Sequence, residues 1–404
     1  MPTYLKKIIY FAGNTVYNCY NLVSFQKEKD VISFFIFIFI HKKETMKKIY
    51  IPLLFILFYP SLYAQKSEQN LIREGVDLHD SGEYQKAIEK YQQALSINPK
   101  SQQAVYEMAL SYLELEDYEK ASEYSTQVID ADDKNLSMLA YCVKSEALTE
   151  MNQTDKAIEL LKEAIRKHGD HYLLHFNLAL NYYKINDTGN TLSHVKKAID
   201  LNKSNSDAFL LNAYALNDVG LWVQSILSFQ MFLLTEPDSQ RSKNAFEEML
   251  QIMRVKPASE KPVERSFIQQ QLYRNPSAIH PDRIPPLTIE QGLNRNYIYH
   301  AITTTLDSLK THNEEPNLYT TFTEVNKAIL TVLEKENDGT KEKNAFWTFY
   351  VPFFSHILHS DYFETYCRYI SVSYFPESLE WWINNKAKAE DFLNWFEYGD
   401  TKTR

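Results

Sequence analysis

The stretch that decides the fold lies at residues 82–99 and reads GEYQKAIEKYQQALSINP. A glycine opens it, and a proline closes it by removing the backbone N–H that a continuing helix needs. Ala87, Tyr91 and Ala94 are spaced by four and three residues, which places them on one side of an α-helix. The small side chains allow a second helix to approach closely. This stretch is therefore predicted to be the turn and second helix of a helical hairpin.

The same pattern returns along the chain at a nearly constant interval. The positions equivalent to Ala94 are Val128, Ala164, Ala198 and Phe232, with successive separations of 34, 36, 34 and 34 residues. A period of this length is typical of solenoids built from paired helices, in which each hairpin buries its apolar face against its neighbours. The repeat predicts five hairpins over about residues 68–239.

The repeated residues resemble those of the tetratricopeptide-repeat (TPR) family. The first unit carries Gly75, Leu78, Gly82, Tyr84, Ala87, Tyr91, Ala94 and Pro99. Later units keep parts of this set: Ala109, Tyr112, Tyr118 and Ala121; Leu148, Ala157, Leu161 and Ala164; Asn177, Ala179, Tyr182 and Ala198; Ala213, Leu216, Gly220, Trp222, Phe229 and Pro237. Ser125, Asp133 and Thr191 depart from it. The resemblance implies a curved stack whose first helices line the inner surface.

The resemblance also implies which side chains face that inner groove. They are Val76, His79, Tyr106, Leu110, Leu113, Phe176, Leu180, Tyr183, Leu210, Tyr214 and Asn217. These residues are mainly apolar and aromatic, and the set of basic and amide side chains that clamps a peptide carboxylate is incomplete. We therefore expect an amphipathic helix or an extended peptide as the partner. The alternative is that the C-terminal half of the chain folds back and fills the groove, because large exposed apolar patches are uncommon on monomers.

The rest of the chain is predicted to be helical, so the expected fold class is all-α. A TPR solenoid with a capping helix at residues 239–255 is expected over residues 65–255. A linker with a short helix follows at 256–286, and a C-terminal helical domain at 287–404. The apolar segment 345–358 contains Pro352 and is too short to span a bilayer. It is expected to be the central helix of that domain, with a lipid or partner docking surface as the alternative.

The N-terminus resembles an export signal. Met46-Lys47-Lys48 begins a charged segment, an apolar run follows, and Ala64 precedes the expected cleavage point, so residues 46–64 are predicted to be a signal peptide. Residues 1–45 are interpreted as a mispredicted extension of the reading frame. The alternative is a membrane anchor that includes the apolar residues 31–40, although ten residues are too few to span a bilayer. The mature chain is expected to be exported, to the periplasm or cell envelope if the source is bacterial, without a stable membrane span.

The charge of the chain argues against a nucleic-acid partner. Its formal net charge is -9, and the first 64 residues hold 8 of its 43 basic and 3 of its 52 acidic side chains. The remaining chain therefore has a formal net charge of -14. A chain this acidic would be repelled by a phosphate backbone.

Two clusters of side chains could in principle support chemistry. His168, His171 and His175 have spacings that could serve a metal, but a packed or solvated arrangement is expected because the first lies before a Gly-Asp break. The second cluster is His356, His359, Glu364 and Cys367, in which a buried, inert thiol is expected.

The sequence therefore predicts an exported scaffold that binds a partner protein or peptide on its concave surface and assembles an envelope complex. No catalytic residue, cofactor or metal is expected. The alternative is that the C-terminal helical domain is a small-ligand-binding or enzymatic module that the TPR array positions.

Overall fold

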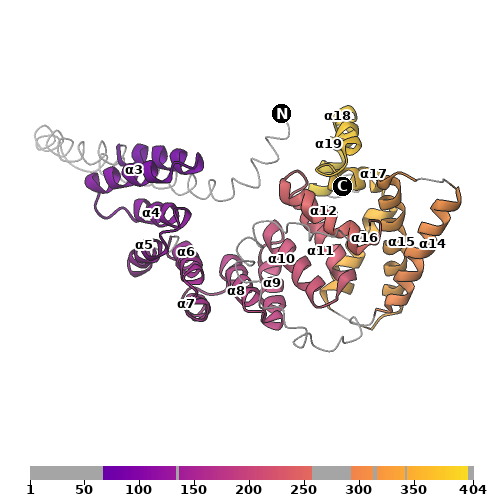
Figure 1. Cartoon of the computed structure of the whole chain (residues 1–404), viewed down its shortest axis with the longest axis horizontal. Coiled ribbons are helices and arrows are strands. Elements are labelled where there is room, and N and C mark those ends of the chain that lie inside the picture. Colours follow the sequence, from indigo (N-terminus) through magenta and orange to yellow (C-terminus); the bar gives the residue numbers. More distant parts are fainter. Residues whose placement is uncertain (1–66, 133–135, 257–292, 313–315, 342–343, 399–404) are drawn as a thin grey trace, which may run out of the picture. The chain divides into compact units, whose positions relative to one another are not determined.

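The structure, a computed structural model, describes residues 67–132, 136–256, 293–312, 316–341 and 344–398 (Figure 1). The predictions for residues 1–64, and nearly all of the predicted linker at 256–286, lie outside these ranges. The chain divides into two compact units at Asp117 and Tyr118. Within the described ranges every regular element is a helix and no strand occurs, which confirms the all-α class.

The first unit is described from residue 67 to residue 117. Residues 67–80 form a helix, followed by α3 (Tyr84–Ile97) and α4 (Gln102–Glu114). Gly75 lies where the first of these helices meets α3, directly against the ring of the fully buried Tyr91. The Ser101 side chain caps the N-terminus of α4 by accepting a hydrogen bond from the Ala104 N–H. The quoted stretch is thus the turn and second helix of a hairpin, as predicted.

One backbone turn recurs at the end of each first helix. Its central residue has a φ between +59° and +77°, and these residues are Gly82, Glu116, Asn152, Asn186, Gly220 and Arg254. The following N–H reaches back over five residues, as from Glu83 to the Leu78 carbonyl at 2.9 Å. Glycine and asparagine adopt this conformation most readily, which explains four of the six residues.

The spacing of these turns reproduces the sequence period. Successive central residues are 34, 36, 34, 34 and 34 positions apart, so the two-residue insertion of the third unit is visible in the backbone. The last interval ends at Arg254, just after α12 (Gln240–Ile252). The helix expected at 239–255 as a cap therefore holds the register of a sixth first helix.

The second unit is also built from repeat helices. Its repeat helices are α5 (Tyr118–Asp130), α6 (Leu136–Glu150), α7 (Thr154–His168), α8 (Tyr172–Lys184), α9 (Thr188–Leu201), α10 (Ser206–Asp218) and α11 (Trp222–Thr235). Each packs against the next in chain order, and α11 packs against α12. The first helices of neighbouring repeats are also in contact with each other, as α6 and α8 are.

The C-terminal part of this unit is helical as well. It comprises α14 (Arg295–His312), α15 (Leu318–Gly339), a π-helical turn η3 (Phe346–Tyr350), α16 (Val351–His359), α17 (Phe363–Ile370), α18 (Pro376–Asn384) and α19 (Lys386–Tyr398). The apolar segment 345–358 is thus η3 and most of α16. The helical run is continuous from residue 345 to residue 359, and Pro352 follows directly after the π-helical turn, where the hydrogen-bond pattern of the helix is already altered. Within the described part of the chain, none of the helices has both the length and the apolar character that crossing a bilayer requires.

Helix α11 joins the repeats to the C-terminal helices. All of its residues from Trp222 to Leu234 are buried. Gln230 on α11 donates to the Asn326 Oδ1 on α15 at 2.8 Å and accepts a hydrogen bond from the hydroxyl of Tyr366 on α17. Apolar residues of α10 to α12 and of α14 to α17 belong to one core cluster. Helices α14 to α17 thus share a core with the last repeat. A separate C-terminal domain at 287–404 remains a prediction.

Gly75 provides a test of the close helix approach. A Cβ at this position would overlap the Tyr91 ring, which cannot move because it is fully buried. We expect Gly75→Ala to lower the free energy of unfolding by about 1–3 kcal/mol, as overpacked cores do. Urea denaturation followed by circular dichroism measures this change.

Gly189→Ala is the matched control, since a Cβ there would meet only Asp187 Oδ1 at 3.8 Å. It should be neutral or stabilise by up to about 0.5 kcal/mol. Equal unfolding midpoints for the two variants would contradict the packing described for Gly75.

Candidate binding surface

Five of the predicted groove residues lie in the first unit. Val76, His79, Leu110 and Leu113 are half-buried, whereas Tyr106 is only 8% exposed. His79 lies 2.9 Å from the Ser111 hydroxyl through its Nδ1 and meets the Tyr84 ring edge-on. The face is therefore a packed surface with partly accessible apolar side chains.

Two carboxyl groups, those of Glu107 and Asp80, lie on the same helices. Burial, and secondarily the nearby charge of Asp80, raises the pKa of Glu107 to about 7. No ion pair links either residue to a basic side chain within the described residues of this unit. Sequence reasoning missed Glu107 because its raised pKa depends mainly on burial by helix packing, and the second cause, Asp80, lies 27 positions away in the chain.

The other six predicted groove residues lie in the second unit. On α8, Phe176, Leu180 and Tyr183 are partly exposed and pack with their inner sides against the core. The preceding first helix, α6, presents the half-buried Cys142 and Glu146 at the equivalent slots. We call these five residues the α6–α8 face.

Hydrogen bonds fix the two helices of this face in register. The Thr149 hydroxyl on α6 donates to the Asn181 Oδ1, and the Asn181 amide donates to the Ser145 hydroxyl at 3.1 Å. Lys184 at the end of α8 forms an ion pair with Glu150 at 3.1 Å. Thr149 and Asn181 are both buried, so their hydrogen bond is shielded from water. The face is therefore held on a rigid support.

The bond between Thr149 and Asn181 has a counterpart in the first unit. His79 and Ser111 are also 32 positions apart and occupy the equivalent places on their first helices. A polar contact between successive first helices thus recurs within each unit. The sequence pattern did not indicate this contact, although polar residues at both positions of each pair were a signal that could have found it.

The α6–α8 face ends at α10, where two of the predicted groove residues are buried. Leu210 and Tyr214 are 0% and 1% exposed and belong to the core that α10 shares with the C-terminal helices. Asn217 is half-buried, and Asp218 accepts a hydrogen bond from the Tyr183 hydroxyl at 2.5 Å. Of the six predicted groove residues in this unit, two are therefore not available on the surface of this structure.

The histidine cluster at 168–175 is built into the repeat packing. His175 is within hydrogen-bonding distance of Asp170 (3.1 Å) and His194 (2.9 Å), and His168 meets the Tyr141 ring edge-on. Across the described ranges, no group of three or more His, Cys, Asp or Glu residues is placed to hold a metal ion.

The second cluster is dispersed between core and surface. Cys367 is fully buried, and burial raises the pKa of its thiol to about 12, which disfavours a reactive thiolate. The ring of His356 stacks on Trp395 at 5.4 Å between centroids, and His359 pairs with Glu334. Glu364 is exposed. Each side chain thus has a different environment, and they form no common site.

Glu107 makes the stability of the first unit dependent on pH. Its pKa in the folded chain, about 7, lies above the usual 4.5, so the folded state holds the proton more tightly than the unfolded state. Stability should therefore fall as the pH rises from about 4.5 to about 7. We expect Glu107→Gln to raise the free energy of unfolding at pH 8 by about 1–2 kcal/mol, less than the full shift implies because the side chain is only half-buried.

Urea titrations at pH 4.5 and pH 8 measure this effect, with Glu89→Gln on the exposed side of α3 as the control. The gain from Glu107→Gln should be absent at the lower pH. An equal gain at both pH values would contradict the assigned pKa.

Comparisons with known proteins agree with the observed repeats. The chain matches the tetratricopeptide-repeat family over residues 78–140 and again over residues 139–166. Among solved structures it is similar to a thermophilic TPR protein of Thermus thermophilus, with 21% identity and a TM-score of 0.41 over 46% of this chain and 100% of that one. It is also similar to Pseudomonas aeruginosa PilF, with 17% identity and a TM-score of 0.40 over 47% and 86% of the two chains.

A third similar structure is PilW, described as a type IV pilus biogenesis factor. It has 14% identity and a TM-score of 0.40, and the match covers 55% of this chain and 96% of that one. No family match is found for the C-terminal half. The residues from 78 to 166 are thus tetratricopeptide repeats.

Proposed function

We propose that this protein is a scaffold that binds a partner polypeptide, and that the α6–α8 face is the main contact surface in the second unit. The observation that carries the proposal is the set of partly exposed side chains on α8, Phe176, Leu180 and Tyr183. The buried side of this first helix is fixed to α6 by hydrogen bonds. A rigid support lowers the entropic cost of binding, because little of the surface has to be ordered on association.

The kind of partner follows from the side chains. Aromatic and apolar residues on successive first helices favour an amphipathic helix or an extended peptide that inserts apolar side chains between them. Aromatic residues supply most of the energy in such interfaces when they become fully buried. In the first unit, Val76, His79, Leu110 and Leu113 are proposed to form a contact surface of that unit. Leu210 and Tyr214 instead support the face from within the core.

Binding rather than catalysis is the proposed activity. The side chain best suited to nucleophilic chemistry, Cys367, is buried with a raised pKa. The alternative, a small-ligand module in the C-terminal helices, has a separate observation in its favour: a pocket that Arg368 and Trp381 help to line.

The proposed location is the cell envelope, after cleavage of a signal peptide behind Ala64. This proposal rests on the sequence alone. Mass spectrometry of the protein purified from its source should find Gln65 as the first residue, and a mature chain that retains residues 46–64 would refute it.

A matched pair of leucine truncations tests the binding face. Leu180 lies on the α6–α8 face, whereas Leu201 is a 43% exposed leucine at the end of the second helix α9. A photo-reactive phenylalanine at position 176 should capture a polypeptide that is then identified and purified. We expect Leu180→Ala to weaken its binding about tenfold, equivalent to ~1.4 kcal/mol, and Leu201→Ala to leave it unchanged.

Isothermal titration calorimetry on the full chain measures both variants, and circular dichroism confirms that they are folded. Equal affinities for Leu180→Ala and the wild type would place the contact elsewhere. Equal capture from position 176 and from the exposed Ser193 on α9 would mean that the captured polypeptide is not specific for the face.

A further inference from the structure

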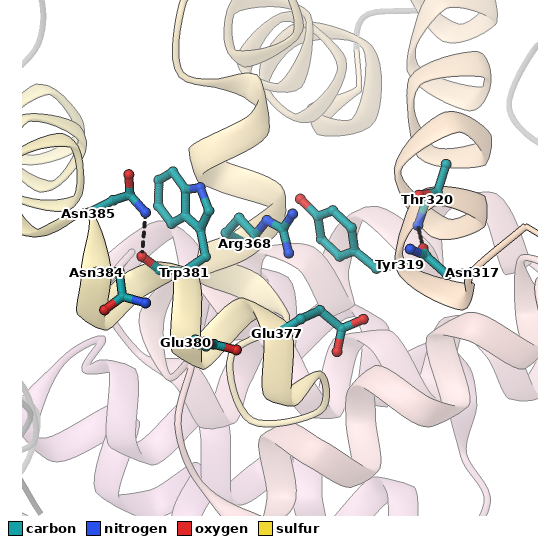
Figure 2. Close-up of a pocket in the computed structure, with 9 residues that line it drawn as sticks. All are labelled: Asn317, Tyr319, Thr320, Arg368, Glu377, Glu380, Trp381, Asn384 and Asn385. Carbon is teal, nitrogen blue, oxygen red and sulfur yellow. Dashed lines mark hydrogen bonds between the residues drawn. The ribbon is translucent and has the colours of Figure 1, made fainter.

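A pocket of about 430 Å³ lies among the C-terminal helices, and no residue of the α6–α8 face lines it (Figure 2). The start of α15 forms one wall with Tyr319, the end of α17 contributes Arg368, and α18 supplies Glu377, Glu380 and Trp381. All of these residues belong to the second unit. The pocket is open to solvent on one side, so a small molecule could enter without any movement of the helices.

Arg368 is the central polar group of the pocket. Figure 2 shows its side chain directed between Trp381 and Tyr319, and its guanidinium carbon lies 3.7 Å from the centroid of the Tyr319 ring. This cation–π stack holds the guanidinium plane in one orientation, because Tyr319 is itself only 7% exposed. The donors of Arg368 are thus presented in a fixed geometry.

The hydrogen bonds of Arg368 are incomplete. Its Nε is buried and has no hydrogen-bond partner among the described residues. The two carboxylates of the rim, Glu377 and Glu380, are exposed, and neither forms an ion pair with Arg368 within the part of the chain that the structure describes. Arg368 lines the pocket, so an acceptor oxygen of a ligand there would supply its guanidinium with a hydrogen bond that the rim carboxylates do not provide.

The charges of the side chains that line the pocket indicate the charge of the ligand. One guanidinium against two carboxylates leaves a formal charge of -1, which disfavours a simple anion such as phosphate. A simple cation would be repelled by the positive charge of the Arg368 guanidinium. A neutral ligand that both donates and accepts hydrogen bonds avoids both penalties, and the pocket offers donors on Arg368, acceptors on Glu377 and Glu380, and both on the exposed amide of Asn384.

The aromatic side chain of Trp381 narrows the chemical class of the ligand further. The half-exposed indole of Trp381 lies beside these polar groups (Figure 2). A flat apolar surface next to carboxylate, amide and guanidinium groups suits a sugar ring, whose faces carry C–H groups and whose edge carries hydroxyls. We propose that this pocket binds a neutral saccharide, with Arg368 donating to a ring hydroxyl and Trp381 contacting a face of the ring. This site is additional to the polypeptide-binding face.

Saturation-transfer NMR and calorimetry on the full chain test the proposal with three probes: cellobiose, maltose and di-N-acetylchitobiose. At least one should bind with a Kd of about 1 mM or tighter. Trp381→Ala and Arg368→Lys should each weaken that binding by about tenfold, the second because an ammonium lacks the planar fork of donors. Glu380→Gln, a substitution of an exposed side chain, should weaken it by about threefold.

Ile383→Ala is the control, since Ile383 is a 45% exposed residue of the same helix that does not line the pocket. It should bind as the wild type does. The proposal is overturned if none of the three sugars binds at about 10 mM, a concentration tenfold above the expected Kd, or if binding survives Trp381→Ala and Arg368→Lys. Saturable binding of phosphate or glycine at this site, lost in Arg368→Lys, would assign the pocket to an anion or an amino acid instead.

Discussion

The structure depends on one constraint: α11 is a helix with no solvent-exposed side, although it carries polar residues. Its serines Ser225 and Ser228 donate to carbonyl oxygens of α10, at 2.8 and 2.9 Å. Gln230 is 0% exposed, and its side chain forms hydrogen bonds with Asn326 on α15 and Tyr366 on α17 instead of with α10. Buried polar groups must be paired, so these residues specify which helices can cover α11 and in what register. Replacement of this cover by another apolar surface would leave Gln230 unsatisfied.

The exposure of the first-helix face differs between α8 and α10. Leu210 and Tyr214 on α10 are buried, and the ring of Tyr214 meets Phe229 on α11 edge-on. Further back in the same unit, Phe176 and Leu180 retain part of their exposure. The two alternatives weighed from the sequence, an open groove and a groove filled by the C-terminal half, both stay predictions. The saccharide pocket proposed between α15, α17 and α18 depends on the same arrangement, because Gln230 also fixes α15 and α17.

Most of the repeat architecture could be predicted from the sequence, since it follows from local signals. Gly82 and Gly220 mark turns that need a positive φ, and their spacing together with the small residues gives the hairpin period. Glu116 and Arg254 adopt the same turn without any favourable residue, so only the period could place them. Arg254 extends the register into α12, where the side chains alone indicated no more than a cap.

The contacts between distant segments could not be predicted in this way. Gln230 reads as an ordinary helix residue, and its partners lie 96 and 136 positions further along the chain. The burial of Tyr214 and the stack of Arg368 on Tyr319 likewise depend on how helices pack rather than on any local pattern. The resemblance to the family gave Leu210 and Tyr214 a groove position, but it contained no information about the C-terminal helices that share their core.

Native-state hydrogen exchange tests the central claim most directly. If α11 joins the last repeat and the C-terminal helices into one cooperative core, the slowest amides of α11, α15 and α17 should exchange with the same free energy and respond equally to denaturant. In Gln230→Ala all three should lose protection together. Exchange of α15 and α17 at a clearly lower free energy than α11, unchanged by Gln230→Ala, would mean that the C-terminal helices only rest on the repeats, and would contradict the account.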